Sequence, residues 1–191
     1  MTWQHFIYFA LPAVLLWAAG AGMAWRRRQL LAHLLTLLGI GVFGAFIVAL
    51  WISLERPPLR TMGETRLWYA LFLPTTGLLV YGRWRYPWIL AFSTLLATVF
   101  TTVNIVQPDI HNKTLMPALQ SPWFAPHVII YMFAYAMLGA AAVMAIYLLW
   151  FKKRAANDHE LDICDNLVHV GWAMMTIGIL FGALRAKEAW G

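Results

Sequence analysis

Long apolar stretches alternate with short charged ones along the whole chain. Six apolar segments stand out, at residues 6–25, 30–54, 67–82, 88–106, 128–151 and 167–184. A helix needs ~20 residues to cross the apolar core of a membrane, and most of the segments are close to this length. The third segment is short and is interrupted by Pro74 and Gly77. The pattern predicts an all-α fold, a polytopic transmembrane helical bundle of about six spans that forms a single membrane domain over residues 1–191.

The composition agrees with a membrane protein. Apolar residues make up 62% of the chain and charged residues 12%, whereas a soluble domain carries about 25% charged residues. The formal net charge of +6 raises the possibility of nucleic-acid binding. We exclude that partner because the basic residues lie in short clusters between apolar segments, where such clusters set membrane orientation.

The basic clusters predict the orientation of the chain. With six spans, one side holds three tight runs of basic residues at helix ends: Arg26, Arg27, Arg28, Arg83, Arg85, Lys152, Lys153 and Arg154. Six more scattered basic residues lie on the other side: Arg56, Arg60, Arg66, Lys113, Arg185 and Lys187. The clustering places the first side inside and both termini on the outer, periplasmic-type face. We expect no cleavable signal peptide, because the charges follow the first apolar segment and do not precede it.

A long connection at residues 107–127 falls on the predicted outer face. Loops of this length in a compact bundle are often functional. Its apolar residues suggest a segment that lies on the bundle or in the membrane interface; they are Leu115, Met116, Leu119, Trp123 and Phe124.

Histidines are the main candidates for metal chemistry. Among the six, His127 is the most informative, because it follows Trp123, Phe124 and Pro126 at the outer end of the fifth segment. Imidazole is a common axial ligand of haem iron, and aromatic neighbours suit a flat apolar ligand. An ordinary interfacial histidine in an aromatic belt explains the same pattern. We assign structural roles to His33 and His169 near the inner surface, and expect solvated loop positions for His111 and His159.

Other chemistry-bearing residues have simple explanations. The acidic cluster Asp158, Glu160, Asp162 and Asp165 is expected to form a solvated inner loop. Cys164 is the only cysteine, so there is no intrachain disulfide, no paired-cysteine metal site and no covalent attachment motif for haem.

Two C-terminal stretches resemble a known family. Residues 113–142, KTLMPALQSPWFAPHVIIYMFAYAMLGAAA, are similar to the CcsA/ResC family of system II cytochrome c biogenesis proteins. Residues 178–191, GILFGALRAKEAWG, resemble the approach to the tryptophan-rich outer loop of that family. The two stretches lie one helix apart, as in the family.

The resemblance implies a function. Proteins of the family bind haem b as a transported substrate at the outer face of the bacterial inner (cytoplasmic) membrane. With a CcsB/ResB-type membrane protein as partner, they present it to apocytochrome c as part of a cytochrome c synthase (haem lyase). His127 matches an outer histidine that ligates the haem iron, and Trp190 and Gly191 match the opening of the tryptophan-rich loop. Trp123 and Phe124 would add aromatic walls.

The sequence also departs from the family pattern. It ends where the tryptophan-rich loop begins, so we expect an N-terminal fragment of a longer protein, without the second outer histidine. Arg185 stands where the family usually has tryptophan. Arg185 or Lys187 is a candidate partner of a haem propionate.

The sequence is compatible with two other functions. One is a small membrane transporter, which would favour polar groups along several spans and often inverted repeats. The other is a structural subunit of a respiratory complex without haem. Haem that copurifies with the chain would separate the first hypothesis from these two.

Overall fold

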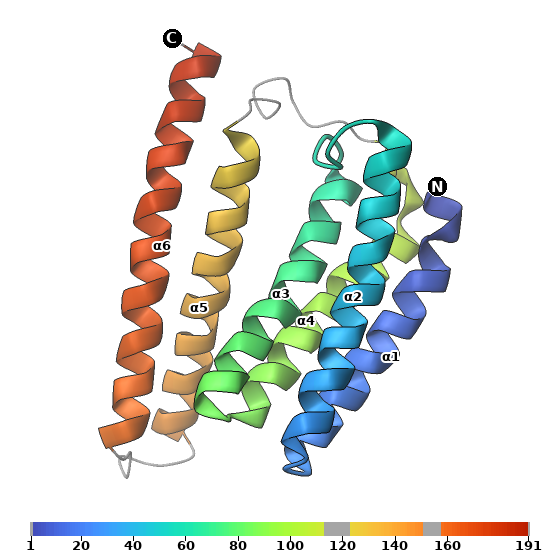
Figure 1. Cartoon of the computed structure of the whole chain (residues 1–191). Coiled ribbons are helices and arrows are strands. Elements are labelled where there is room, and N and C mark those ends of the chain that lie inside the picture. Colours follow the sequence, from blue (N-terminus) through green and yellow to red (C-terminus); the bar gives the residue numbers. More distant parts are fainter. Residues whose placement is uncertain (1, 113–122, 151–157, 191) are drawn as a thin grey trace. The chain divides into compact units, whose positions relative to one another are not determined.

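The computed structural model describes residues 2–112, 123–150 and 158–190. These residues form six α-helices and two short 3-10 helices, with no strand among them (Figure 1). The bounds are η1 (Trp3–His5), α1 (Phe6–Trp25), α2 (Gln29–Leu54), α3 (Met62–Trp84), α4 (Pro87–Val106), η2 (Pro108–His111), α5 (Phe124–Trp150) and α6 (Asp158–Trp190). The prediction of an all-α polytopic bundle is confirmed. The basic run 152–154 and Leu115, Met116 and Leu119 lie outside the described residues.

Within the described residues, five helices are long and apolar enough to cross a membrane. The candidate spans are Trp3–Trp25, Gln29–Leu54, Pro87–Val106, Pro126–Trp150 and Asp158–Glu188. The protein is therefore an integral membrane protein. Helix α3 is not among the five, and its buried Glu64 and its basic residues Arg66 and Arg83 contribute to its lower hydropathy. A sixth crossing at residues 67–82 stays a prediction, as does the placement of both termini outside.

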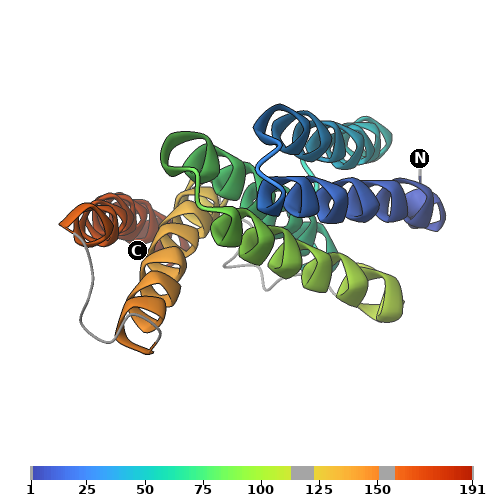
Figure 2. The ribbon, with the colours of Figure 1, turned by 90° about the horizontal axis from the view of Figure 1, so that it is seen from below.

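The chain divides into two compact units, residues 1–120 and 121–191. In the first unit, α1 packs on α2 and α4, and α3 packs on the same two helices. Figure 2 shows α1 between α2 and α4. The four helices thus close a small bundle of antiparallel neighbours, as short connections favour.

Small residues let α1 and α2 approach closely. A Cβ added to Gly39 would lie 2.7 Å from the indole of Trp17, and one added to Gly20 would meet the hydroxyl of Thr36. Large aliphatic side chains point outward instead, with Leu11 58% exposed and Leu15 61% exposed. This arrangement is typical of membrane helices, which pack through small residues and turn their large aliphatic side chains toward lipid.

A buried carboxylate fixes the start of α3. Glu64 is 2% exposed, and both of its oxygens accept hydrogen bonds from Arg56, at 3.0 and 2.9 Å. The backbone N–H groups of Arg60 and Thr61 also donate to Glu64, and the Thr61 hydroxyl accepts from the Glu64 N–H. This capping box satisfies backbone donors at the helix start and holds the preceding loop against α3.

His111 is not the solvated loop residue that we expected. It ends the 3-10 helix η2, and its ring stacks flat on Trp3, with centroids 3.6 Å apart. The partner of its Nε2 is the carbonyl of Asn104 at 2.9 Å; since a carbonyl only accepts, Nε2 carries the proton. Gly63 packs beneath the ring, where a Cβ would lie 2.7 Å away. No local sequence pattern indicates this packing, because the residues that contact His111 come from three separate segments.

The packing of His111 predicts a pH-dependent stability. Burial lowers the pKa of His111 below its ordinary value of 6.5, and the hydrogen bond to the Asn104 carbonyl offsets part of this change. The unfolded chain therefore binds a proton before the folded chain does. The stabilisation is complete above pH 6.5 and is lost as the pH falls through the lowered pKa of the folded state. Thermal unfolding in detergent between pH 5 and 8 should show this loss in the wild type and less of it in His111→Gln. An identical pH dependence of the unfolding temperature in both proteins would show that His111 is not its cause.

The second unit is a pair of antiparallel helices, α5 and α6. The start of α5 and the end of α6 lie at the same end of the pair (Figure 1). The acidic cluster at residues 158–165 forms the first turns of α6, so the expectation of a loop there is wrong. Acidic side chains near a helix start are favoured by the helix dipole. The apolar residues Ile163 and Leu167 in and after the cluster are buried at 1% and 0% exposure, which favours the helix further.

Candidate functional site

His127 lies in the first turn of α5. Its backbone N–H donates to the carbonyl of Trp123 at 3.1 Å, which is one of the first hydrogen bonds of this helix. Pro126 is compatible with this turn, because the first N–H groups of a helix have no partner within the helix. Since the candidate membrane span begins at Pro126, the imidazole lies at the edge of the apolar segment.

The imidazole of His127 is fixed by the backbone of α6. Its Nδ1 lies 2.8 Å from the carbonyl oxygen of Gly178. Because the carbonyl only accepts, Nδ1 must carry a proton, and in the neutral tautomer with this bond the lone pair is on Nε2. Gly182 makes room for the ring, since a Cβ there would lie 2.8 Å from Cε1 of His127. None of the described residues forms a hydrogen bond with Nε2.

The contact belongs to a regular register between the two helices. Along α6, three glycines receive side chains from α5: His127 packs against Gly182, Tyr131 against Gly178 and Leu138 against Gly171. Each step forward along α5 is matched by the same step backward along α6, as expected for antiparallel helices. These side chains and glycines form one face on each helix. Sequence reasoning missed Gly178, Gly182 and Tyr131; the four-residue spacing of the two glycines was the only signal.

One aromatic ring contacts the imidazole, and two others stack at the same end of the helix pair. The ring of Tyr131 meets that of His127 edge to face, with centroids 4.5 Å apart and planes at 68°. Trp123, which is 39% exposed, stacks on Phe181 of α6 at 5.7 Å and 26°. The structure thus places Trp123 and His127 at the same end of the helix pair, beside an exposed aromatic surface.

Phe124, Arg185 and the backbone of Trp190 lie near the same end of the pair. Phe124 begins α5, and the guanidinium of Arg185 lies 5.6 Å from the centre of its ring. Trp190 is the last residue of α6. The Trp190 side chain and Gly191 lie outside the described residues.

His33 and His169 each form a hydrogen bond within their own helix. His33 bonds to the carbonyl of Gln29 and His169 to the carbonyl of Asp165, each one turn earlier in its own helix. These contacts agree with the structural role that we assigned to both. No group of three metal-ligating side chains occurs in the part of the chain that the structure describes. A metal bound at His127 would therefore have to bring most of its ligands with it.

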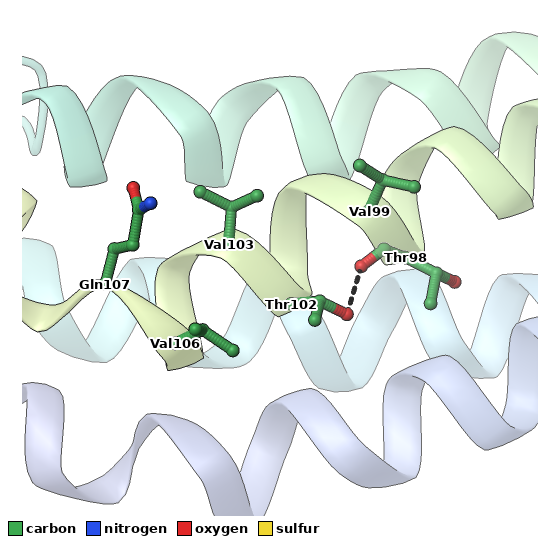
Figure 3. A pocket seen from close by; sticks show the side chains of 6 residues that line it. All are labelled: Thr98, Val99, Thr102, Val103, Val106 and Gln107. Carbon is green, nitrogen blue, oxygen red and sulfur yellow. Dashed lines mark hydrogen bonds between the residues drawn. The ribbon is translucent and has the colours of Figure 1, made fainter.

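A groove on α4 offers no comparable chemistry. It encloses about 300 Å³ and is lined by Thr98, Val99, Thr102, Val103, Val106 and Gln107 (Figure 3). The hydroxyl of Thr102 donates to the carbonyl of Thr98, and that of Thr98 donates to the carbonyl of Thr94, both at 2.8 Å. The hydroxyls are therefore engaged within α4, and the groove is left mostly apolar.

Comparison with known families points to one group of proteins. The family model described as "Cytochrome C assembly protein" matches residues 60–191, which include α3 to α6 and the His127 site. No solved structure matches the chain.

Individual relatives carry a consistent description. The chain is 32% identical to the cytochrome c biogenesis protein CcsA of Chlamydomonas reinhardtii over 54% of its length and 32% of the relative. It is 26% identical to the protein of the same name from Hordeum vulgare, over 76% of the chain and 61% of the relative. For the CcsA of Mesostigma viride the identity is 28%, over 96% of the chain and 73% of the relative. The chain thus spans less than two thirds of the length of the first two relatives.

Proposed function

The chain belongs to the cytochrome c assembly protein family, and from this premise we propose that it binds haem at the start of α5 and presents it for covalent attachment to apocytochrome c. The observation that carries this proposal is the hydrogen bond of 2.8 Å from Nδ1 of His127 to the carbonyl of Gly178. A histidine that ligates a metal through one nitrogen generally donates the proton of the other to a carbonyl or carboxylate. The bond leaves Nε2 as the atom available to haem iron.

The surrounding residues suit a flat, largely apolar substrate. Trp123 and Phe181 offer a stacked aromatic surface near His127, and the buried ring of Phe124 packs at the same end of the helix pair. Aromatic faces of this kind bind planar rings by stacking and by exclusion of water. Since α5 enters the apolar segment here, the substrate would lie at the membrane surface, where an apocytochrome can reach it.

The residues of this chain therefore have distinct roles in the proposal. Nε2 of His127 donates its lone pair to the iron, and the Gly178 carbonyl holds the imidazole in the required tautomer. The aromatic rings orient the macrocycle. Bound haem supplies the vinyl groups that react with the two thiols of apocytochrome c. Placement on the outer face of a bacterial inner membrane, and work with a CcsB/ResB-type partner as part of a synthase, belong to the same proposal.

Haem content tests the proposal against the two other functions. We expect the wild-type chain, expressed in a haem-producing host and purified in detergent, to carry haem that a pyridine haemochrome assay detects. His127→Ala should lose most of it. His33→Ala is the matched control, because His33 is also partly buried and bonded through Nδ1 to a carbonyl; it should keep the wild-type content. A wild type without haem would favour a transporter or a structural subunit.

A further inference from the structure

A second pair of residues continues the helix register beyond His127. Phe124 lies three residues before His127 on α5, and Arg185 lies three residues after Gly182 on α6. Residues three apart share a helix face, so the contact of Phe124 with Arg185 lies one turn nearer the helix ends than that of His127 with Gly182. We propose that Arg185 is a subsite for a carboxylate of the substrate, namely a propionate of haem. This inference rests on the proposed function.

The contact with Phe124 prepares the guanidinium for such a role. Phe124 is 7% exposed, so its ring is a fixed support, and the guanidinium lies 5.6 Å from its centre. A cation over an aromatic face is attracted by the ring. The N–H groups of a guanidinium are spaced to match the two oxygens of a carboxylate. No carboxylate pairs with Arg185 among the described residues.

The position of Arg185 distinguishes it from the neighbouring cation. Arg185 is half-buried, whereas Lys187 is exposed. Two residues further along a helix, Lys187 points about 160° away from Arg185. Lys187 is therefore turned away from the face that holds Gly178, Gly182 and Arg185. Of the two cations that sequence alone offered for a propionate, the geometry points to Arg185.

The distance along the helices fits one bound molecule. Three residues of α-helix span ~4.5 Å, so the imidazole and the guanidinium are neighbours on the same end of the pair. Haem combines a central metal with two carboxylates on one edge. With the iron at Nε2 of His127, that edge would face the helix ends and the aqueous surface, where a charged group is favoured.

The test compares two ligands that differ only at the carboxylates. Ferric haem and its dimethyl ester are titrated into the purified full chain in an uncharged detergent, and binding is followed by the Soret absorbance. Arg185→Met keeps an apolar side chain over Phe124 but removes the charge. We expect it to weaken haem binding by about 10-fold or more and to change binding of the dimethyl ester by less than about twofold. Lys187→Met should leave both affinities unchanged, and Arg185→Lys should restore part of the haem affinity.

Each outcome decides a separate question. Equal losses for both ligands in Arg185→Met, or no loss for either, would overturn the carboxylate subsite. An effect of Lys187→Met on haem but not on the ester would assign the role to Lys187 instead. The proposed function itself fails if neither ligand binds the wild type through His127. In that case the titration curves of wild type and His127→Ala are the same.

Discussion

Replacing Gly182 with alanine should weaken haem binding by about 10-fold to 100-fold, the usual effect of disturbing the support of a metal ligand. The new Cβ would lie 2.8 Å from Cε1 and 3.0 Å from Nδ1 of His127. The methyl group is attached to the backbone, so the imidazole must rotate away. Rotation breaks the hydrogen bond from Nδ1 to the Gly178 carbonyl, and with it the fixed tautomer. Titration of ferric haem into the purified chain measures the affinity.

A second glycine provides the control for this variant. Gly139 lies in α5, and a Cβ added there would meet no atom within 4 Å. Gly139→Ala makes the same chemical change in the same helix pair and should leave the affinity unchanged. Wild-type haem affinity in a folded Gly182→Ala protein would contradict the role of Gly182 as the space for the imidazole.

Replacing Glu64 with alanine should lower the free energy of unfolding by about 3–5 kcal/mol, as removal of one partner of a buried ion pair generally does. The side chain of Arg56 is 24% exposed and that of Glu64 3% exposed, so the guanidinium would lose its charge partner in a largely dry site. The N–H groups of Arg60 and Thr61 would also lose their acceptor. Thermal unfolding in detergent, followed by circular dichroism, should show a lower midpoint.

The neighbouring acid at residue 55 is the control for this change. Glu55 is exposed, and it caps the end of α2 in the left-handed conformation, with φ at 54°. Glu55→Ala removes the same charge from the same loop and should change the free energy of unfolding by less than about 0.5 kcal/mol. Equal midpoints for Glu64→Ala and Glu55→Ala would show that the buried pair does not stabilise the fold.

Much of the helical architecture could be predicted from the hydropathy pattern. The apolar segment 6–25 has the same bounds as α1, and the segment 88–106 differs from α4 by one residue. The prediction was less accurate where polar residues take part in a helix. The acidic turns of α6 at residues 158–165 have low hydropathy, yet Ile163 and Leu167 bury that part of the helix. Hydropathy alone does not report this, because it ignores which face of a helix is packed.

The start of α5 illustrates the same limit. We expected the loop to continue to residue 127, but α5 begins at Phe124. Pro126 lies within this first turn, because proline has no N–H to donate and the first turn of a helix does not need that donor. The shift places His127 inside the first turn and sets its register against α6.

The candidate site could be predicted only in part. His127, Trp123 and Phe124 are neighbours in sequence, so the pattern suggested that they act together. The contributions of Gly178, Gly182 and Tyr131 depend on the register of α5 against α6, which no local pattern determines. The iron-binding role of His127 and the roles of Trp190 and Gly191 stay predictions.

The central claim is that Nε2 of His127 ligates haem iron, and chemical rescue tests it most directly. Ferric and ferrous absorption spectra would be recorded for wild type and His127→Gly with added haem, with and without free imidazole. We predict the Soret band of a histidine-ligated haem in the wild type, its loss in His127→Gly and its return when imidazole fills the space. A wild-type spectrum in His127→Gly without imidazole would contradict the claim.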